Sequence, residues 1–523
     1  MNKPIHHVVI VGGGSAGWLT AGLIAAEHAT ENAETKIKIT LIESPDVKPI
    51  GVGEGTWPSM RNTINKIGIS EHDFIKSCDA SLKQGSQFID WRTGDKNDVY
   101  YHPFMNPQGY NQVNLHHAWQ SKYSEHDFAD VINMQSHICK ADLAPKQLST
   151  PAFAAVTNYG YHLNAAKFAE LLKEHCTTKL NVCHILDHVS VINNELNGDI
   201  ASVSCKKHGE IAGDLFVDCT GSASLLLGKH YNIKLISQKH ILFNDSALAV
   251  QVPYPNATDD IASATLSTAQ SAGWIWDIGL PSRRGIGYTY ASDYISDDEA
   301  HQQLVRYLSD SIGASEAQKV SARKISFTPG YREKFWHRNC VAIGMSSGFL
   351  EPLEASALAM IELGATMIAE QFPSNREQMS ILSERYNQRF IYRWQRVIEF
   401  LKLHYVLSQR TDSPYWIDNK DKNTIPSRLQ DLLSLWQYQP PSRYDFIENE
   451  EVFPSASYQY VLYGMKFHTQ SEQTVKSEKE QRLADQFFST NIQHVHKFKA
   501  ALPSNRALYR HIANNKLPVN FSR

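Results

Sequence analysis

The sequence has no large excess of charge of either sign and no long apolar run. Its 523 residues carry 51 Lys and Arg and 54 Asp and Glu, for a formal net charge of -3. So weak a net charge favours neither nucleic acid nor an anionic membrane as a partner. No run approaches the roughly 18 apolar residues of a membrane helix, and the first residues lack the apolar core and cleavage site of a signal peptide. We therefore expect a cytoplasmic protein without a membrane or nucleic-acid partner.

Cysteine is scarce as well, with seven residues that are odd in number and widely scattered. No two of them form a C-x-x-C pair or a zinc-like spacing, which argues against a disulfide scaffold and against a structural metal site. Reduced thiols fit this pattern best, and we expect no metal. The cysteines are Cys78, Cys139, Cys176, Cys183, Cys205, Cys219 and Cys340.

Internal repeats and low-complexity segments are also absent from the sequence. A chain of 523 residues, 42% of them hydrophobic, is too long for one ordinary core. We expect about two or three structural units, which together can easily bury a cofactor.

The N-terminus has the pattern of a β-α-β unit. The stretch "IHHVVIVGGGSAGWLTAGLIAAEHA" predicts a buried strand from about Ile5 to Val11, a glycine turn, and a helix from about Ala16 to His28. The stretch "KIKITLIES" predicts a second strand that ends at Glu43.

The glycine turn indicates a dinucleotide site. Gly12, Gly14 and Gly17 form G-x-G-x-x-G between the strand and the helix. The first glycine permits a tight turn, the second lets the backbone approach a pyrophosphate, and the third allows close packing of helix and strand. Glu43 would accept hydrogen bonds from a ribose. These residues alone leave FAD and a nicotinamide cofactor open, although the loop "GVGEGTWP" after the second strand has the length to wrap a larger cofactor.

Two later segments repeat the pattern of a strand followed by glycine. They are "DLFVDCTGSASLL" and "CVAIGMSSGFLEPLEASALAMIELGATMIAE", the second of which ends in a long apolar helix. We predict one α/β sheet interrupted by substrate-facing insertions at about 60–210 and 235–335, followed by a mainly helical region. The predicted domains are a core at residues 1–370, which contains the insertions, and a substrate-covering region at 371–523.

Two tryptophans two residues apart in "GWIWDIGLP" stand out. On a strand, Trp274 and Trp276 lie on one face and Ile275 on the other. An isolated W-x-W is most simply a pair of core aromatics that pack on a sheet.

Taken together, these stretches resemble the flavin-dependent tryptophan halogenases. The resemblance spans residues 8 to about 416, and the motifs occur in the family's order. It implies a Rossmann-type, glutathione-reductase-like FAD-binding fold. The matching stretches are "VGGGSAGW", "LIES", "IGVGEGTWPS", "YHPF", "DLFVDCTG", "GWIWDIGLP" and "NCVAIGMSSGFLEPLEAS".

The resemblance implies a two-component reaction. FADH2 from a separate flavin reductase, O2 and a halide, chloride or bromide, yield hypohalous acid, which travels through a tunnel to a lysine beside the substrate. Trp274 and Trp276 correspond to the tryptophans that keep organic substrate away from the flavin. The FAD-binding residues that it implies are Gly12, Gly14, Ser15, Ala16, Gly17, Glu43, Val52, Gly53, Glu54, Gly55, Met345 and Leu358.

The catalytic pair follows from two further matches. The segment "DASLKQGSQFIDW" places the lysine at Lys83, and "EPLEAS" places a glutamate at Glu354, with Glu351 as the nearby alternative. An ammonium can donate hydrogen bonds to hypohalous acid or form a haloamine, and the sequence leaves both open. The glutamate would hold the lysine and take the proton that the ring loses.

Two departures from the family pattern concern the halide and the W-x-W loop. The family's S-T-G becomes Ala355, Ser356 and Ala357, so we expect Ser356 and Ala357 to form the halide site with an altered halide preference. Gly279 stands where the family has proline, with Pro281 two residues later, and we expect a less rigid loop.

At the substrate end, His102 and Phe104 of "YYHPF" keep the aromatic half of the family's substrate sandwich, and Phe453 stands in place of a tryptophan. The run "SRYDFIENEEVF" has no convincing counterpart of the residues that bind the amino acid's carboxylate and amine. We therefore expect an indole without that head, or a larger indole-bearing or phenolic molecule, rather than free tryptophan.

Two other functions remain open at this point. One is a flavin monooxygenase that hydroxylates an aromatic directly, and the other is a non-catalytic FAD-binding protein. Halide dependence separates them from a halogenase. A homodimer is compatible with the sequence.

Overall fold

The computed structural model describes residues 4–30, 37–47, 53–95, 98–470, 477–515 and 517–518. The chain divides into two compact units, each built from three segments. The chain passes between the units several times, so each unit contains residues from both sides of residue 370. The functional division predicted at residue 370 stays a prediction. Unit 1 comprises Met1–Ala80, Leu163–Gln238 and Thr328–Trp394, and unit 2 comprises Ser81–His162, Lys239–Phe327 and Gln395–Arg523.

The predicted β-α-β unit is present at the start of unit 1. β1 (His7–Val11) and β2 (Lys38–Glu43) pair in parallel, with Val9 opposite Thr40. Helix α1 (Ser15–Glu27) connects them in sequence and is buried along much of its length, because most of its residues are apolar.

The predicted interrupted sheet is also present, in the order β20-β21-β12-β1-β2-β8. The two later strand-then-glycine segments supply β12 (Leu215–Asp218) and β21 (Cys340–Ala342), which continue the parallel pairing beside β1. The edges are β8 (Cys183–Leu186) and β20 (Trp336–His337). Since β8 lies within the predicted insertion at 60–210, that insertion is shorter than expected, and residues 81–162 are the part that joins unit 2.

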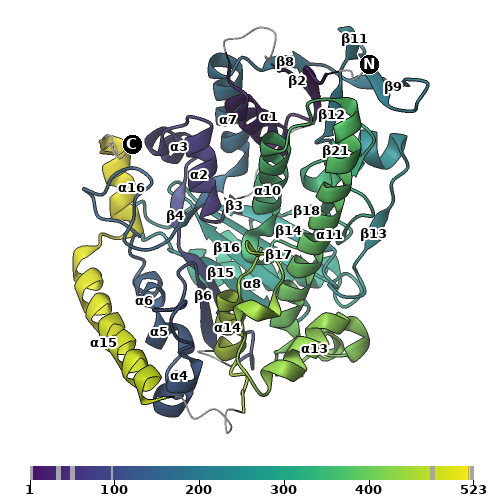
Figure 1. Ribbon diagram of the computed structural model, residues 1–523. Coiled ribbons are helices and arrows are strands. Elements are labelled where there is room, and N and C mark those ends of the chain that lie inside the picture. Colours follow the sequence, from purple (N-terminus) through teal and green to yellow (C-terminus); the bar gives the residue numbers. More distant parts are fainter. Residues whose placement is uncertain are drawn as a thin grey trace. The chain divides into compact units, whose positions relative to one another are not determined.

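Five of the helices described in unit 1 pack against one another. Helix α10 (Ser356–Glu370) runs beside α1, and α7 (Ala165–Lys179) also contacts α1, as Figure 1 shows for α10 and α1. Helix α2 (Ser59–Lys66) packs on α10, and α3 (Glu71–Ser77) packs on α2 and α7.

Two small sheets complete unit 1. One has the order β11-β10-β9 and the other β13-β19-β22. Their strands are β9 (Val189–Asn194), β10 (Ile200–Cys205), β11 (Gly209–Ala212), β13 (Leu235–Ser237), β19 (Gly330–Arg332) and β22 (Gly348–Phe349).

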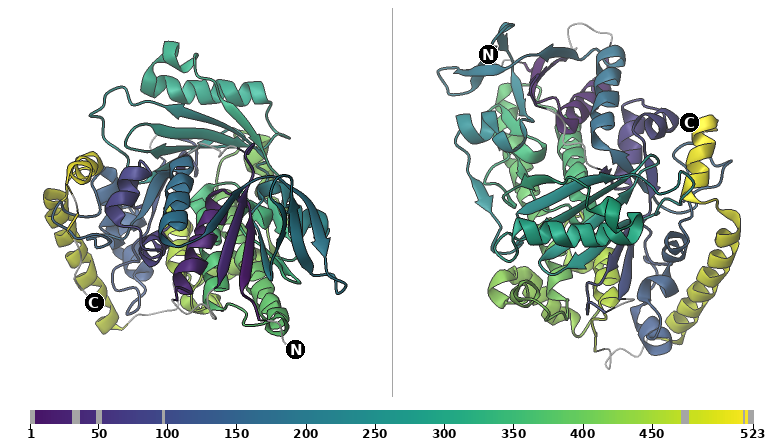
Figure 2. Two further views of the ribbon diagram at one scale, coloured as in Figure 1. Left: turned by 90° about the horizontal axis from the view of Figure 1, so that it is seen from above. Right: turned by 180° about the vertical axis from the view of Figure 1, so that it is seen from behind.

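Unit 2 is built on a seven-stranded sheet in the order β18-β14-β17-β16-β15-β5-β6. Helix α8 (Asp297–Ile312) lies across this sheet in the right-hand view of Figure 2 and begins with a capping box of Ser296 and Glu299. The strands are β5 (Gly85–Ile89), β6 (Val99–Pro103), β14 (Ser246–Val252), β15 (Thr265–Gln270), β16 (Gly273–Gly279), β17 (Arg284–Tyr290) and β18 (Arg323–Ser326).

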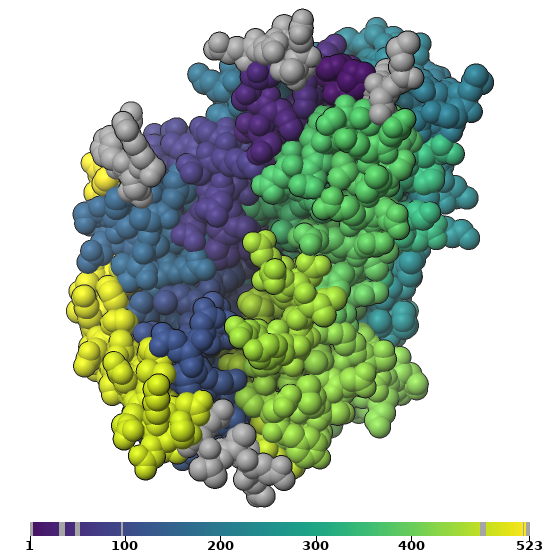
Figure 3. Space-filling view, in the orientation of Figure 1, coloured from purple at the N-terminus to yellow at the C-terminus, as the bar shows by residue number. Residues whose placement is uncertain are grey.

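The predicted helical C-terminal region is confirmed, since all the regular elements described after residue 375 are helices. Figure 3 shows α15 along the surface beside the segment that contains α4 to α6, which it contacts. The C-terminal helices are α11 (Arg376–Val406), α12 (Pro414–Asp418), α13 (Ser427–Trp436), α14 (Ser455–Gly464), α15 (Glu478–Ala501) and α16 (Asn505–Asn514). The earlier segment that α15 contacts holds α4 (His116–Tyr123), α5 (Phe128–Ile132) and α6 (Gln135–Lys140).

All seven cysteines are free thiols, and six of them are buried. Within the part of the chain that the structure describes, no helix combines the length and the apolarity that a membrane crossing requires.

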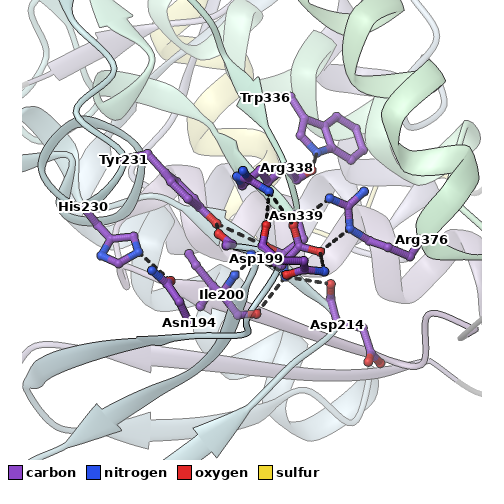
Figure 4. A network of polar contacts seen from close by, with 12 residues as sticks. Asn194, Asp199, Ile200, Asp214, His230, Tyr231, Trp336, Arg338, Asn339 and Arg376 are labelled. Carbon is purple, nitrogen blue, oxygen red and sulfur yellow. Dashed lines mark hydrogen bonds and ion pairs between the residues drawn. The ribbon is translucent and has the colours of Figure 1, made fainter.

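A buried polar network ties the small β9–β11 sheet to the first turn of α11 (Figure 4). Arg376 donates two hydrogen bonds to the carboxylate of Asp199, at 2.6 and 2.7 Å. The side chain of Asn339 accepts from the backbone N–H of Ile200 at 2.9 Å and donates to its carbonyl at 2.8 Å. Burial works against the charged carboxylate, but the hydrogen bonds and charge of Arg376 outweigh it and hold the pKa of Asp199 below its usual value.

We expect Arg376→Leu to lower the free energy of unfolding by about 2 kcal/mol at pH 7, because it leaves a buried carboxylate without its main cation. The matched control is Arg482→Leu, whose partner Glu478 is at 3.5 Å and is 90% exposed; its effect should stay below about 0.5 kcal/mol. Since the folded pKa of Asp199 is depressed, the difference between wild type and Arg376→Leu is full above about pH 4 and disappears as the pH falls through the folded pKa. Urea unfolding followed by tryptophan fluorescence measures both, and equal losses in the two variants would contradict the assignment.

Candidate active site

The glycine turn between β1 and α1 is closely packed at its first and third glycines. Gly12 has a φ of 120°, and a Cβ there would lie 2.1 Å from the carbonyl oxygen of Cys219. A Cβ on Gly17 would lie 1.9 Å from the carbonyl oxygen of Gly12. Because both obstacles are backbone atoms, only glycine fits at these two positions.

The second glycine differs, because a Cβ on Gly14 would meet no atom within 4 Å. Gly14 is also the N-cap of α1 and makes no side-chain capping hydrogen bond. The first N–H groups of α1 are thus left for another acceptor, and the open space at Gly14 lets that acceptor come close. This arrangement fits the pyrophosphate of a dinucleotide such as FAD.

Glu43 lies beside the same turn, as its place at the end of β2 predicts. A Cβ on Gly13 would fall 2.3 Å from Cγ of Glu43, so this side chain covers the turn. Its carboxylate is 2.8 Å from Nε2 of His184 and 3.5 Å from Nζ of Lys173. A carboxylate at this place can accept hydrogen bonds from a ribose, and that role stays a prediction.

The remaining predicted FAD residues lie on four elements of unit 1. Ser15 and Ala16 open α1, and Leu358 lies in the first turn of α10, where it is 5% exposed. Met345 belongs to the 3-10 turn Gly344–Ser346, which approaches α1 so closely that a Cβ on Gly344 would lie 2.8 Å from Cβ of Ala16. Gly53, Glu54 and Gly55 form the short strand β3 (Gly53–Gly55), and Val52 lies outside the described residues.

Glu354 precedes α10 in an unusual backbone conformation. Glu354 (φ 62°, ψ 9°) and Ala355 (φ 54°, ψ 43°) are both left-handed, which is rare for residues with a Cβ. The alternative, Glu351, is 1% exposed, and Glu354 is 6% exposed.

The predicted halide residues open α10. Its N-cap, Ala355, offers no side-chain hydrogen bond, so the backbone N–H groups of the first turn can hold an anion. Ser356 and Ala357 occupy that turn. Ala357 lies in regular helix, whereas Glu354 and Ala355, which precede Ser356, have a positive φ.

Lys83 ends the short strand β4 (Ser81–Lys83), which pairs antiparallel with β7 (Gly160–Asn164). Asn505 holds the strand from α16, because its side chain accepts from N–H of Leu82 at 3.4 Å and donates to its carbonyl at 3.0 Å. Lys83 is 1% exposed, and its Nζ lies 5.4 Å from the centre of the Phe104 ring. The lysine is thus a buried cation over an aromatic face.

A neutral histidine lies near this lysine. Nε2 of His162 is 2.8 Å from Oγ1 of Thr265. Burial, and then the charge of Lys83, lower the pKa of His162 well below its usual value. His162 therefore adds no second positive charge beside Lys83 at neutral pH.

The predicted substrate residues share unit 2 with Lys83. His102 is 5% exposed, and its Nε2 lies 2.9 Å from Oγ of Ser457. The ring of Phe453 stacks on Phe400, with centroids 3.9 Å apart, and Phe400 is 5.6 Å from the ring of His102. Phe400 and Ser457 were missed from sequence, since nothing in their local patterns marks them.

Trp274 and Trp276 lie on the same face of β16, with ring centroids 6.3 Å apart. Trp276 covers Gly287 on β17, where a Cβ would fall 2.1 Å from the indole. Trp274 is 1% exposed and lies 6.3 Å from Trp91. Both rings therefore pack in the core of unit 2, and their role as a barrier beside the flavin stays a prediction.

Gly279, where the family has proline, ends the same strand. It pairs with Arg284, and its carbonyl accepts a hydrogen bond from Oγ of Ser81 at 2.5 Å. A Cβ at Gly279 would lie 3.0 Å from both Ile261 and Tyr254, so there is little room for a side chain. The W-x-W strand and the strand that carries Lys83 are joined at this point.

A cavity of about 270 Å³ lies in unit 2 between the segment 107–115, the segment 441–444 and the start of α14. It shares the first turn of α14 with Ser457, because Ser455 lines it. Its lining is mostly polar and includes Tyr110, Asn111, Gln112, Asn114, Arg443, Tyr444, Gln459 and Glu480.

Comparison with known proteins decides the family. Residues 7–481 match the model of the tryptophan halogenase family. The chain is 33% identical over 478 residues to tryptophan 6-halogenase SttH of Streptomyces toxytricini, covering 87% of this chain and 88% of that protein. It is 30% identical over 453 residues to tryptophan 7-halogenase RebH of Lentzea aerocolonigenes, covering 84% and 83%. A crystal structure of a tryptophan halogenase from Shewanella frigidimarina NCIMB 400 matches with a TM-score of 0.96 at 51% identity, over 99% of both chains.

The chain belongs to the tryptophan halogenase family. Membership confirms the resemblance, the α/β FAD-binding fold and the expectation of an enzyme. A flavin-dependent halogenase family implies FAD and a halide.

The two units divide the predicted residues of this halogenase into two groups. Unit 1 holds the glycine turn, Glu43, Glu354 and the first turn of α10. Unit 2 holds Lys83, the tryptophan pair and the substrate residues. Since Lys83 and Glu354 belong to different units, the predicted approach of the two side chains stays a prediction.

The glycine geometry predicts opposite behaviour for two substitutions. Gly14→Ala meets no protein atom, so we expect an unchanged melting temperature but an FAD dissociation constant raised about tenfold or more, because the methyl occupies the space of the pyrophosphate. Gly17→Ala collides with backbone, so it should unfold several degrees lower whether or not FAD is present. Differential scanning fluorimetry and flavin fluorescence titration measure the two effects. Wild-type FAD affinity in Gly14→Ala would place the pyrophosphate elsewhere.

Proposed function

We propose that this protein is an FADH2-dependent halogenase that attaches a halogen to an electron-rich, indole-type aromatic ring. The observation that carries the proposal is the buried Lys83, whose Nζ lies 5.4 Å from the centre of the Phe104 ring in a member of this family. A cation held next to an aromatic face is placed to act on a ring that lies against that face.

The role of Lys83 is to deliver the halogen. Its ammonium can donate a hydrogen bond to hypohalous acid and polarise the halogen, or its amine can carry the halogen as a haloamine. In the overall exchange the ring gains the halogen and loses a proton, and the oxygen of the hypohalous acid leaves as water. Burial of Lys83 keeps water from competing for the oxidant.

Unit 1 would supply the oxidant and remove the proton. Reduced FAD, when bound at the glycine turn, supplies with O2 the oxidising power that converts a halide into hypohalous acid. The uncapped N–H groups at Ser356 and Ala357 hold the halide, and the carboxylate of Glu354 accepts the proton that the ring loses. Trp274 and Trp276 keep the organic substrate from the flavin.

The substrate is proposed to be an indole-bearing molecule. His102, Phe104 and Phe453 offer aromatic surface, and the names of the relatives, tryptophan 6-halogenase and tryptophan 7-halogenase, are consistent with an indole. The cavity near Ser455 has room for the part of a larger substrate that lies beyond the ring. Electrons come from a separate flavin reductase in this proposal.

Halide dependence tests the function as a whole. The protein is incubated with FAD, a flavin reductase and NADH, with indole or tryptophan and with chloride or bromide, and products are read by mass. Halogenated product supports the proposal. Oxygenated product that forms without halide would identify a monooxygenase, and flavin binding without any product from either substrate would favour a non-catalytic role.

Lys83→Met should lower the rate of halogenated product about a thousandfold, because the group that directs the halogen is lost. Oxidation of FADH2 and release of free hypohalous acid, detected with monochlorodimedone, should continue. The matched control is Lys146→Met: Lys146 is also fully buried, with Nζ 5.0 Å from the centre of the Tyr159 ring. Product formation per folded molecule should survive in the control, and its survival in Lys83→Met would refute the role of Lys83.

Arg443 tests the contribution of the cavity. Its guanidinium lines the cavity and donates to the hydroxyl of Tyr444 at 2.8 Å. We expect Arg443→Ala to raise KM for indole-3-propionate about tenfold and to leave KM for indole unchanged, because only the first molecule carries a carboxylate. The control is Arg482→Ala on α15. A parallel rise of both KM values in Arg443→Ala would show that the arginine acts on the fold rather than on the substrate.

A further inference from the structure

The turn in front of α10 needs an external restraint. Two successive residues with a Cβ, Glu354 at φ 62° and Ala355 at φ 54°, occupy the left-handed region, which such residues visit singly and at a cost. Strained backbone of this kind persists only where neighbouring groups hold it.

The indole of Trp57 supplies such a restraint. Its Nε1 donates a hydrogen bond of 2.7 Å to the carbonyl oxygen of Glu354, the first of the two left-handed residues. Trp57 lies between β3 and α2, and its own carbonyl accepts from N–H of Met60 at 3.1 Å. The backbone of Trp57 is thus tied to the first turn of α2, which begins two residues later.

A second contact fixes that helix to α10. Glu362 on α10 is 3% exposed and accepts hydrogen bonds from Oγ of Ser59 at 3.2 Å and from Oγ1 of Thr63 at 2.5 Å, both on α2. Burial raises the pKa of Glu362 to about 8, so this contact is a neutral carboxyl at pH 7. Trp57 is therefore held at a fixed position relative to the N-terminus of α10.

We propose that Trp57 is a positioning residue: by holding the Glu354 carbonyl, its indole N–H fixes the left-handed turn and thereby orients both the Glu354 side chain and the N–H groups of Ser356 and Ala357. The inference rests on the proposed function, in which the glutamate accepts a proton and these N–H groups hold the halide.

Trp57→Phe tests the proposal, because it keeps an aromatic ring and removes the donor. The matched control is Trp336→Phe, since Nε1 of Trp336 donates to the carbonyl of Arg338 at 3.1 Å and Arg338 is also left-handed, at φ 55°. Trp336 also belongs to unit 1 but takes no part in the proposed site.

Bromide is the probe, and the full chain is used. Isothermal titration of FAD-loaded protein gives the bromide dissociation constant, and anomalous scattering from bromide-soaked crystals gives its position and occupancy. We expect Trp57→Phe to raise the bromide dissociation constant and the bromide KM about tenfold, with the FAD dissociation constant unchanged. Trp336→Phe should leave all three at wild-type values. Identical bromide binding in the wild type and Trp57→Phe would overturn the proposal.

A rescue variant separates this role from a general loss of stability. Glycine adopts the left-handed region without the cost that alanine carries, so Trp57→Phe combined with Ala355→Gly should regain part of the lost bromide affinity. No recovery would overturn the proposed action through the backbone. If Trp57→Phe does not fold, the double variant replaces it, and its bromide affinity should lie below that of the wild type because the recovery is only partial.

The outcomes distinguish this inference from the proposed function. Wild-type protein that forms no halogenated product, together with bromide affinity that falls in Trp57→Phe alone, would sustain the positioning role and reject the halogenase. Halogenation by the wild type with unchanged bromide binding in Trp57→Phe would sustain the halogenase and reject the positioning role of Trp57. Absence of bromide from the start of α10 in wild-type crystals would overturn both.

Discussion

The proposed chemistry of unit 1 depends on two helix N-termini that lack capping side chains. Helix α1 begins after Gly14 and α10 begins after Ala355, and neither residue offers an acceptor to the first N–H groups of its helix. Those groups must find another acceptor, and the helix dipole favours an anion. The two helices pack side by side, so the proposed sites for a dinucleotide phosphate and for a halide rest, within one unit, on the same property of the backbone.

Unit 2 solves a different problem, which is to keep a charged amine buried beside apolar rings. The strand that carries Lys83 is very short, and contacts with other segments hold it in place. These contacts are the pairing with β7, the hydrogen bonds of Asn505, and the hydrogen bond of Ser81 to Gly279. Aromatic side chains from β6, α11 and the segment before α14 surround the proposed substrate position. A buried ammonium in such surroundings acts more strongly on a polarisable halogen than it would in water.

Local patterns predicted the first part of the fold well. The β1-α1-β2 unit, the three distinct environments of Gly12, Gly14 and Gly17, and the place of Glu43 all follow from strand and helix periodicity with glycine at the turn. The family motifs extended this to Lys83 and Glu354 as candidates. The less rigid loop expected at Gly279 stays a prediction, but a sequence does not show that Ser81, 198 residues away, donates to its carbonyl or that its neighbours leave little room for a side chain.

The sequence by itself determined the elements, the family and the types of group available for chemistry, since these depend on residues close together in the chain. Only the tertiary structure decided which groups restrain one another. The hydrogen bond from Trp57 to Glu354 spans 297 positions, and the contact of Thr63 with Glu362 spans 299. The left-handed turn before α10 was likewise decided by the tertiary structure. Alanine and glutamate do not favour that conformation, so contacts made by the folded chain must hold the turn.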